Sequence, residues 1–380
     1  MAVDPTGDET KLIEIAGQFA QEVVAPNAAQ WEAERRYPRE ALTAACEAGL
    51  GGLLVPTELG GQGAGFAATA HIVEALAAAD FGFTFPLIVH NNLAGSIARN
   101  GNDVQKERYL PDMIAGRRIG AFLLTEPGAG SDAASIATRA MQNADAWTLD
   151  GEKAWVTSGV AADILSVYAQ TDPAAGWRGI ACFLVDAETE GVERSAPYAL
   201  IGGHAMGVSD FAFRNCALDE DALFIPPGEG FKAALSGIDI ARANVAMASC
   251  SMLATALETA LDYTSRRWAF GQATSDFQGL QWELADVATD LEAARLLARQ
   301  AVARFDAGAD SAVAAAHAKK FATRVAFKGI HTCMQAMGAM GARADYPLAR
   351  HLAAVKLAEY MDGTTGIQNV VIARKLFADD

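Results

Sequence analysis

Apolar residues recur at helical spacing through the first third of the chain, between residues 9 and 116. Leu12, Ile15, Phe19 and Val23 step by three and four positions, which places them on one face of an amphipathic helix. Segments rich in glycine separate this run from later ones, as expected of turns between helices. The pattern predicts an all-helical N-terminal region.

The pattern changes between about Ile119 and Val208 to short runs rich in β-branched and aromatic residues. Glycine, aspartate and proline separate these runs, which is typical of short strands joined by turns. The runs are AFLL, WTLDGEKAWVTSG, DILSVYAQ and RGIACFLVD. A β domain is therefore expected in the middle of the chain.

Long helical patterns return after the segment PPGEGF and continue from Lys232 to the last residue. One apolar seam follows a single helix face: Leu280, Leu284, Val287, Leu291, Ala294, Ala298, Ala301 and Phe305. Such a seam is typical of helices in a bundle. It could face either the core of this chain or a second copy of it.

The order helices, strands, helices predicts segregated layers rather than alternating β and α units. The expected fold class is α+β, with an N-terminal α-helical domain, a middle β-barrel or sandwich domain and a C-terminal four-helix-bundle domain. We place the boundaries at 1–119, 120–231 and 232–380. A length of 380 residues suits two or three domains around a large core.

The net charge of −16 argues against a nucleic-acid partner or an anionic membrane surface, because both would repel an acidic protein. The longest charge-free helical stretch, Ala243 to Leu257, is shorter than the ~20 apolar residues that cross a bilayer, so no membrane span is expected. The acidic N-terminal segment MAVDPTGDETK lacks an apolar signal core, and we expect a cytoplasmic protein.

Two further kinds of site find no support in the sequence. The five cysteines are scattered and the six histidines show no metal-ligand spacing, so reduced thiols and no metal site are expected. No G-x-G-x-x-G follows a predicted strand, and the GGQGAG segment at Gly60–Gly65 lies between helices. A Rossmann or P-loop nucleotide site is therefore disfavoured.

The segment LLTEPGAGSD, from Leu123 to Asp132, is the most informative turn in the chain. It follows a predicted strand and combines glycines with Thr, Ser and Asp side chains. Such a turn can present backbone N–H groups and hydroxyls to a polar ligand that approaches closely. Taken alone, it could equally be an ordinary β-turn.

Further segments follow that turn along the chain: DGEKAWVTSG at Asp150–Gly159, Ala162-Asp163, RGIACFLVD, SRRWAFGQ, and FQ at Phe277-Gln278. In this order and spacing they closely resemble the acyl-CoA dehydrogenase family of FAD flavoproteins, over the whole chain. The resemblance implies the α/β/α fold of that family, FAD as the cofactor and an acyl-CoA thioester as the substrate.

The resemblance also implies contacts for the turn. Thr125 is expected to contact the flavin, with help from the backbone of Phe122 to Leu124. Ser131, at the far end of the turn, is expected to contact the CoA part of the thioester.

The W-x-T pair of the family shelters the isoalloxazine ring, and this chain carries Trp155 and Thr157 with Ser158 beside them. An aromatic face suits a flat ring, and a hydroxyl near flavin N5 would stabilise negative charge on the reduced flavin. Without the surrounding motif, Trp155 could be an ordinary core residue of the β domain.

Another set of residues is expected to reach the FAD of a neighbouring subunit. In relatives this set binds the pyrophosphate and adenosine part, where a guanidinium suits a diphosphate. Ala339 departs from the family pattern, since it replaces the second glycine of the Gly-rich turn. The assigned residues are Arg267, Phe270, Gln278, Gln335 and Gly338.

Assembly and electron transfer follow from the same resemblance. Relatives are tetramers, built as dimers of dimers, and pass electrons to an electron-transferring flavoprotein. We therefore expect a homotetramer and that partner. Asp239 and Arg242 match the D-x-x-R helix that grips CoA in relatives, although residues at this spacing could also form a surface ion pair.

The catalytic base of many relatives is the Glu of a Y-E-G-T segment, and this chain reads YMDGTTG there. The resemblance makes Asp362 the base, Gly363 a substrate contact and Thr364 a cofactor contact. The carboxylate is one methylene shorter, and small misplacements can cost ~10²-fold in rate. A second family position for the base holds Ala241, and Glu359, one turn earlier, could share the pocket.

Three functions remain open at this point. The favoured one is an acyl-CoA dehydrogenase in which Asp362 removes the α-proton while the β-hydrogen leaves as hydride to flavin N5, with a branched or cyclic acyl group as one option. The second is a flavin oxidase of a small carbon acid, similar to nitroalkane oxidase. The third is a flavoprotein that keeps the fold without catalysis.

Overall fold

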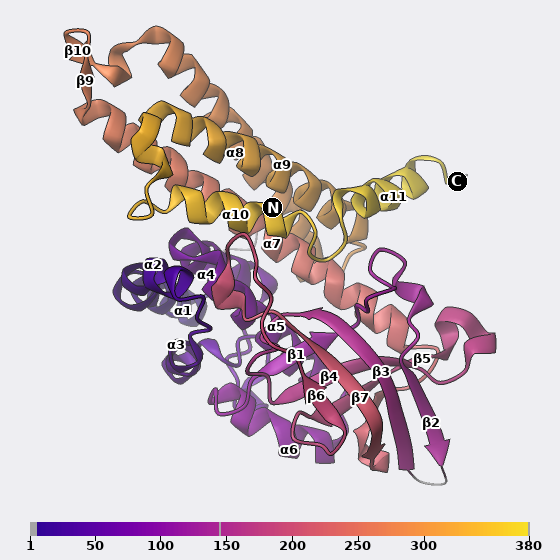
Figure 1. The fold of residues 1–380 in the computed structure, drawn as a ribbon. Coiled ribbons are helices and arrows are strands. Elements are labelled where there is room, and N and C mark those ends of the chain that lie inside the picture. Colours follow the sequence, from indigo (N-terminus) through magenta and orange to yellow (C-terminus); the bar gives the residue numbers. More distant parts are fainter. Residues whose placement is uncertain (1–5, 144–145, 379–380) are drawn as a thin grey trace.

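The computed structural model describes residues 6–143 and 146–378. Helices precede and follow a central sheet, so the expected α+β order is confirmed. Figure 1 shows the N-terminal helices and the sheet in the lower part of the view, with the long C-terminal helices above them. The first five residues of the acidic N-terminal segment lie outside the described range.

The N-terminal region is helical, as its apolar periodicity predicted. Thr6 and Asn102 each begin a helix with a capping box, in which two otherwise unpaired backbone N–H groups are satisfied. The helices are α1 (Gly7–Phe19), α2 (Ala25–Ala33), α3 (Arg39–Ala45), α4 (Phe66–Ala79), α5 (Phe81–Asn100) and α6 (Asp103–Ile114), with the short turns η1 (Ala20–Val24), η2 (Cys46–Leu50) and η3 (Thr57–Leu59) between them.

The middle region forms one eight-stranded mixed sheet with the strand order β6-β7-β3-β2-β4-β5-β8, and β1 pairs in parallel with β4. Its central strands β4 and β5 are almost entirely buried, and they pair in antiparallel register. The strands are β1 (Gly120–Leu123), β2 (Arg139–Asn143), β3 (Ala146–Val156), β4 (Ile164–Gln170), β5 (Ile180–Asp186), β6 (Val192–Arg194), β7 (Ser209–Leu218) and β8 (Leu223–Ile225).

The sheet extends further along the chain than the predicted β-rich stretch, which ended near Val208. β7 and β8 lie beyond that point, and β7 pairs with β3 over most of its length. Residues 195–208 form no strand and separate β7 from the earlier strands. The local sequence pattern therefore did not indicate that another strand follows. β2 and β6 were also missed, because their exposed side chains give no apolar run.

The C-terminal region is helical. The longest helix, α7, is apolar along much of its length, and 83% of its most apolar window is buried in the molecule. By length and composition alone it could cross a membrane, and its burial is that of a core helix. The helices are α7 (Gly230–Arg266), α8 (Gln278–Asp306), α9 (Ala312–Met337), α10 (Leu348–Ala358) and α11 (Thr365–Leu376), and the hairpin β9 (Trp268–Ala269) and β10 (Gln272–Ala273) connects α7 to α8.

The apolar seam of α8 packs inside this chain. Six of its eight residues are buried and the first and last are packed against the same cluster, together with side chains of α7 and α9. Of the two alternatives that the sequence left open, the seam therefore serves the intrachain core. All five cysteines are free and buried, as expected of reduced thiols.

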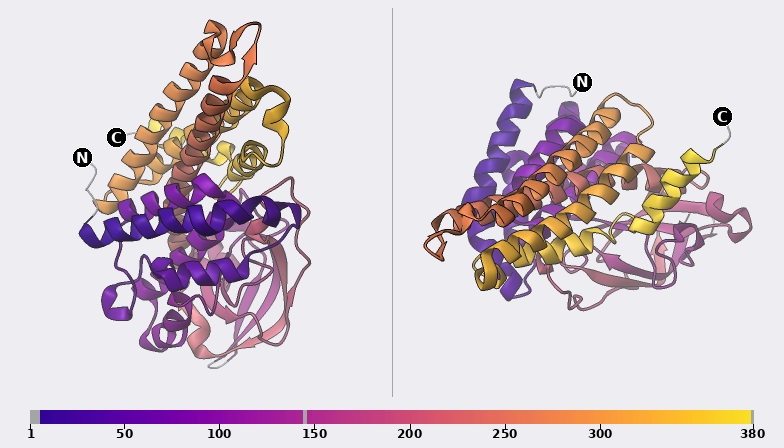
Figure 2. Two further views of the ribbon diagram at one scale, coloured as in Figure 1. Left: turned by 90° about the vertical axis from the view of Figure 1, so that its left-hand side faces the viewer. Right: turned by 90° about the horizontal axis from the view of Figure 1, so that it is seen from above.

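α5 and α7 connect the helical regions to the sheet and run in opposite directions past each other. Phe85, early in α5, shares a core cluster with Ala243 of α7. Ala98, late in α5, shares another cluster with Ala234, nearer the start of α7. Figure 2 shows the long C-terminal helices rising above the N-terminal helices and the sheet, so the contact between α5 and α7 lies where the three regions meet.

Candidate active site

The glycine-rich turn after β1, residues 123–132, is tied to the neighbouring strand by its backbone. The N–H of Ala154 on β3 donates to the carbonyl of Thr125 at 2.9 Å, and Glu126 and Ala129 exchange two backbone hydrogen bonds. Gly128 and Gly130 face open space, and Ser131 is exposed. The turn therefore presents polar groups at the end of a fixed strand, as predicted.

A buried ion pair holds this turn in place. The Nζ of Lys153, which is 0% exposed, donates to the carbonyl of Leu124 at 3.0 Å and to Oε1 of Glu126 at 2.7 Å. The carboxylate of Glu126 also accepts from the backbone N–H groups of Ala137 and Thr138. Lys153 and Glu126 were not among the predicted site residues.

The pKa values of this pair follow from burial and mutual attraction. Desolvation lowers the pKa of Lys153 to about 8, although the charge of Glu126 opposes this shift. Burial would raise the pKa of Glu126, but Lys153 and the hydrogen bonds to the carboxylate outweigh it, and the net shift is downward. Both groups are therefore charged at neutral pH.

Trp155 lies one residue beyond the strand contact and has a positive φ of 60°. The residue is 59% exposed, and its ring packs edge-on against Tyr198, with the ring centroids 4.5 Å apart. Asp210 accepts hydrogen bonds from the Trp155 backbone N–H, at 3.2 Å, and from the Tyr198 hydroxyl. This arrangement holds a large aromatic face in a strained, exposed position next to the turn.

Thr157 and Ser158 complete the predicted flavin-contacting segment. Ser158 is buried with a φ of 62°, and its backbone N–H donates to the carbonyl of Met206 at 2.9 Å. Thr157 is half-buried. Backbone strain of this kind persists only where surrounding structure enforces it, and it concentrates at functional sites.

Asp362 lies in a tight turn between α10 and α11 and has a φ of 51°. Its backbone carbonyl accepts from Nε of Arg242 at 2.8 Å and from Nε2 of Gln368 at 3.3 Å. Its carboxyl Oδ2 is buried and has no hydrogen-bond partner among the described residues. The turn thus fixes the backbone while one carboxylate oxygen stays available.

The next residue, Gly363, is held by two buried side chains. Its carbonyl accepts from Nζ of Lys319 at 2.5 Å and from Nε2 of Gln368 at 2.7 Å. A Cβ here would meet the Arg242 guanidinium at 3.0 Å, and φ is 91°, so the position requires glycine. Thr364 caps α11 by accepting from the N–H of Ile367.

Burial controls the ionisation of this second turn. Desolvation raises the pKa of Asp362 to about 6, while the charges of Lys319 and Arg242 act in the opposite direction. Desolvation also lowers the pKa of Lys319, which is 1% exposed, to about 8, and the charge of Asp362 opposes that shift. A carboxylate with a raised pKa is a stronger base than an exposed one, and it is still mostly ionised at neutral pH.

A cavity of about 280 Å³ lies between the Asp362 turn and strand β1. It is lined by Asp362, by Phe122 of β1, by Ala241 of α7 and by Phe85 and Val89 of α5. The predicted base and the strand that leads into the predicted flavin turn therefore face one cavity. A group bound against β1 and an acyl chain could both approach the Asp362 carboxylate there.

Neither of the two alternative positions for the base brings a carboxylate to the cavity. Ala241 lines the cavity but has no acid group. Glu359 does not line it, and its carboxylate is paired with Nζ of Lys356 at 2.6 Å. Among the three positions, only Asp362 brings a carboxylate to the cavity.

Arg242 is buried and its guanidinium is engaged within the chain. Besides the Asp362 carbonyl, it binds Oδ1 of Asp239 at 2.7 Å. Burial raises the pKa of Asp239 despite that ion pair. The expected CoA contact of these residues stays a prediction, and the structure adds that Arg242 holds the turn of the base.

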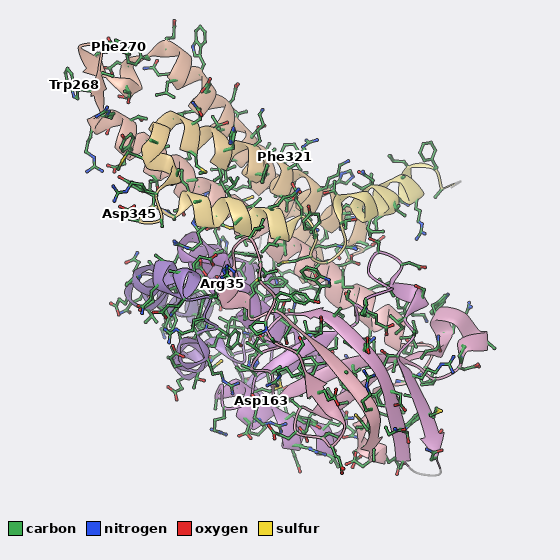
Figure 3. The ribbon with its side chains drawn as sticks, viewed as in Figure 1. Arg35, Asp163, Trp268, Phe270, Phe321 and Asp345 are labelled. Atoms are coloured by element: carbon green, nitrogen blue, oxygen red, sulfur yellow. The ribbon has the colours of Figure 1, made fainter. Side chains whose placement is uncertain are left out.

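The residues predicted to reach a neighbouring FAD are not brought to this cavity within one chain. Phe270, with a φ of 52°, is 97% exposed at the tip of the β9–β10 hairpin, far from the sheet (Figure 3). The end of α7 and the loop before α10 meet there, where Tyr263 packs edge-on against Tyr346. Arg267, Gln278, Gln335, Gly338 and Ala339 are all exposed.

The region around the first turn fits a flavin. The exposed face of Trp155 offers a stacking surface, and the open glycines allow a flat ring or its chain to approach closely. In the described part of the chain, the Thr125 hydroxyl makes no hydrogen bond, so it is available to a ligand. Thr125, Trp155 and Thr157 would hold the ring against β1 and β3.

Neither Lys319 nor Gln368 was predicted from the sequence to be a site residue. Each is a buried polar residue on an otherwise regular helix, and the apolar positions around Lys319 on α9 could have marked it as inward-facing. Nothing local, however, links either residue to the Asp362 turn.

Comparisons with known proteins cover the whole chain. Residues 6–117 match the family model of the acyl-CoA dehydrogenase N-terminal domain, residues 121–216 that of the middle domain and residues 228–377 that of the C-terminal domain. The chain is 33% identical over 380 residues to the mitochondrial isobutyryl-CoA dehydrogenase of Dictyostelium discoideum, covering 100% of this chain and 91% of that protein.

Solved structures agree with the sequence matches. The butyryl-CoA dehydrogenase of Megasphaera elsdenii superimposes with a TM-score of 0.95 at 30% identity, covering 100% of both chains. A chain in a structure described as the electron transferring flavoprotein of Acidaminococcus fermentans superimposes with a TM-score of 0.96 at 33% identity, again covering 100% of both chains.

Proposed function

Since this chain belongs to the acyl-CoA dehydrogenase family of flavin-dependent oxidoreductases, we propose that it desaturates a short or branched acyl-CoA between Cα and Cβ, with Asp362 as the base. The observation that carries the proposal is the position of Asp362, half-buried at the cavity that Phe122 also lines, with a buried Oδ2 that has no hydrogen-bond partner among the described residues. FAD would accept the β-hydrogen as a hydride when bound.

The residues of the site supply the conditions for proton abstraction. The α-proton of a thioester is weakly acidic, so the base must be desolvated and held close to it. Burial raises the pKa of Asp362 to about 6, and Arg242, Gln368 and the constraint on Gly363 fix the turn. Proton transfer would then leave Asp362 neutral, a state that its buried surroundings favour.

A short or branched acyl group is supported by the apolar side chains near the base. Phe85 and Val89 line the cavity, and a relative that covers the whole chain carries the name isobutyryl-CoA dehydrogenase. A bound hydrocarbon chain would exclude water from Asp362 and so preserve its raised pKa.

Assembly and electron transfer are part of the same proposal. The exposed aromatic side chains Trp268 and Phe270, together with the exposed Arg267, would complete an FAD site on a neighbouring subunit of a homotetramer. An electron-transferring flavoprotein would then reoxidise the flavin. Mass measurement in solution and flavin loss from the variant Arg267→Ala would test the first of these statements.

The main test is anaerobic titration of the purified flavoprotein with straight, branched and cyclic acyl-CoAs, followed by flavin absorbance. We expect bleaching with at least one short or branched compound. Asp362→Asn should keep the flavin and slow bleaching by about 10²–10⁴-fold, since that is the usual contribution of a general base. If no acyl-CoA bleaches the flavin, while nitroalkanes give peroxide in air, the chain is an oxidase of carbon acids.

A further inference from the structure

A small void lies between α4, α5 and α7, next to the cavity that Asp362 lines. Its volume is about 10 Å³, and Asn92 of α5 lines both spaces. On α7, Ala241 lines the cavity, and Asn244, three residues later, lines the void. Residues at this spacing share one face of a helix, so the void continues the wall of the cavity by one helical turn.

Most side chains around the void are apolar, and three of its five polar residues are satisfied by the backbone. The hydroxyls of Thr69 and Thr84 donate to carbonyls one turn earlier, at 3.0 and 2.7 Å. The amide of Asn91 donates to two backbone carbonyls and accepts from one backbone N–H. These three side chains therefore have their partners within the fold.

The other two polar residues of the void, Asn92 and Asn244, differ in this respect. In the described part of the chain, no hydrogen bond involves either side-chain amide. Asn244 is only 4% exposed, although its amide has two donor hydrogens and an acceptor oxygen. Buried amides without partners are uncommon in folded proteins and lower their stability. The pair is therefore available to a group that enters the void.

The size and the lining of the void select the kind of group that fits. A volume of about 10 Å³ is close to what one water-sized group needs. No charged side chain lines the void, and burial of an unpaired charge is costly. Two amides offer donors and acceptors together, so a hydroxyl, which also donates and accepts, fits better than a methyl group or a carboxylate.

A short acyl chain bound at Asp362 can reach the amide pair. Asn244 lies about 4.5 Å beyond Ala241 along α7, at the helical rise of 1.5 Å per residue. On α5, Val89 and Asn92 are likewise three residues apart, and both line the cavity. The carbons of the chain would thus lie against Val89 while a hydroxyl enters the void.

We propose that Asn92 and Asn244 bind a hydroxyl group of the acyl chain, which makes a short hydroxylated acyl-CoA the preferred substrate. Both amides are then specificity-determining residues, and neither takes part in the transfer of the proton or the hydride. This inference rests on the proposed desaturation with Asp362 as base.

The kinetic test compares acyl-CoAs in which a hydroxyl replaces the terminal methyl group. We set γ-hydroxybutyryl-CoA against pentanoyl-CoA and δ-hydroxyvaleryl-CoA against hexanoyl-CoA, with kcat/KM from anaerobic flavin reduction by the holoenzyme. We expect the hydroxylated member of at least one pair to be preferred by about 10- to 100-fold, because its methyl counterpart leaves both amides without partners.

Substitutions in the holoenzyme test whether the amides cause this preference. Asn244→Leu replaces the amide by a hydrocarbon of similar size and should remove the preference, and Asn92→Leu should do the same. Asn244→Ser keeps a donor and an acceptor and should retain part of it. The matched control is Asn27→Leu on α2, outside the cavity, where the amide donates to the Val23 carbonyl at 2.8 Å; this variant should leave the preference unchanged.

Denaturant unfolding supplies a readout that does not depend on flavin reduction. Asn244→Leu removes an amide without a protein partner, so the unfolding midpoint should stay the same or rise. Asn91→Leu, at the same void, removes three hydrogen bonds and should lower the midpoint. If Asn244→Leu destabilises the protein as much as Asn91→Leu, the amide binds a structural water and the proposal is wrong.

The outcomes separate this inference from the proposed function. If both members of each pair reduce the flavin equally and Asn244→Leu changes neither, the hydroxyl subsite is refuted and the desaturation stands. If no acyl-CoA reduces the flavin, the desaturation is refuted, and calorimetry with the same pairs still tests the amides. Equal affinity for the hydroxyl and methyl compounds would then refute the subsite, whereas tighter binding of a hydroxyl compound that is lost in Asn244→Leu would support it.

Discussion

Two turns of this protein are each held by a buried lysine, and they differ in how the positive charge is balanced. Under the turn after β1, Lys153 binds the carbonyl of Leu124 and pairs with Glu126 at 2.7 Å. Under the Asp362 turn, Lys319 binds the carbonyls of Glu359 and Gly363 but forms no ion pair of its own within the described residues.

This difference separates a structural role from a chemical one. The charge of Lys153 is paired directly with the Glu126 carboxylate, so it stabilises the turn as part of an ion pair. The charge of Lys319 is balanced by Asp362, whose pKa it lowers, and more weakly by Glu359. A change at Lys153 should therefore alter folding and flavin binding, whereas a change at Lys319 should alter the ionisation of the base.

The largest effect is expected for Lys153→Met. This variant leaves the buried Glu126 carboxylate without its cation, and breaking a buried pair in this way costs about 3–5 kcal/mol of unfolding free energy. We expect a large fall in stability and loss of the flavin, measured by denaturant unfolding and by the ratio of flavin to protein absorbance.

A double variant checks the reason. Lys153→Met with Glu126→Gln removes both charges and should recover much of the lost stability. If the single variant is as stable as the parent, or if the double variant is less stable than the single one, the ion pair does not stabilise the turn. The proposed difference between the two lysines is then wrong.

Lys319→Met is expected to have an intermediate effect, on rate and on pH dependence. The loss of two hydrogen bonds to the turn should misplace Asp362 and lower the rate of flavin reduction by up to ~10²-fold. Asp362 must be ionised to accept a proton, so activity in the parent protein should fall as pH drops through about 6. Without the cation its pKa rises, and this acid limb should move to higher pH.

The variant Lys319→Arg distinguishes charge from packing. It keeps the positive charge, so the acid limb should stay near its original pH while the larger side chain lowers the rate. If Lys319→Met lowers the rate but leaves the pH profile unchanged, Lys319 only holds the turn in position. The contrast with Lys153 would then be removed.

The same two turns show what the sequence could and could not reveal. The helical regions followed from apolar periodicity, and the α8 seam from Leu280 to Phe305 packs in the intrachain core, one of the two alternatives that its spacing left open. Asp362 and Trp155 could be named as candidate site residues because each stands in a sequence motif. β7 lies inside the predicted β domain of residues 120–231, but it was not predicted as a strand, because it follows the β-rich runs that end near Val208 and pairs with β3, which is distant in sequence.

The supporting residues were missed for a related reason. Lys153, Lys319 and Gln368 are polar side chains that each donate to a backbone carbonyl outside their own element. Carbonyl acceptors belong to every residue and leave no trace in the side-chain pattern. The residues that present chemistry could therefore be named in advance, whereas those that hold them in place became visible only in three dimensions.

The smallest effect is expected for Asp362→Glu, which tests the geometry of the second turn. The longer side chain extends the carboxylate by one methylene into the cavity, while the backbone carbonyls still bind Arg242, Lys319 and Gln368. We expect the flavin reduction rate with short acyl-CoAs to change by less than the ~10²-fold that a misplaced catalytic group can cost, because the longer side chain can adopt a new rotamer while the turn is held. The rate with longer straight chains, measured in the same anaerobic assay, should change in proportion if the carboxylate length does not select among substrates. A gain confined to straight chains would show that the short carboxylate of Asp362 contributes to specificity. A loss as large as that of Asp362→Asn would show instead that the turn fixes the side chain as tightly as the backbone.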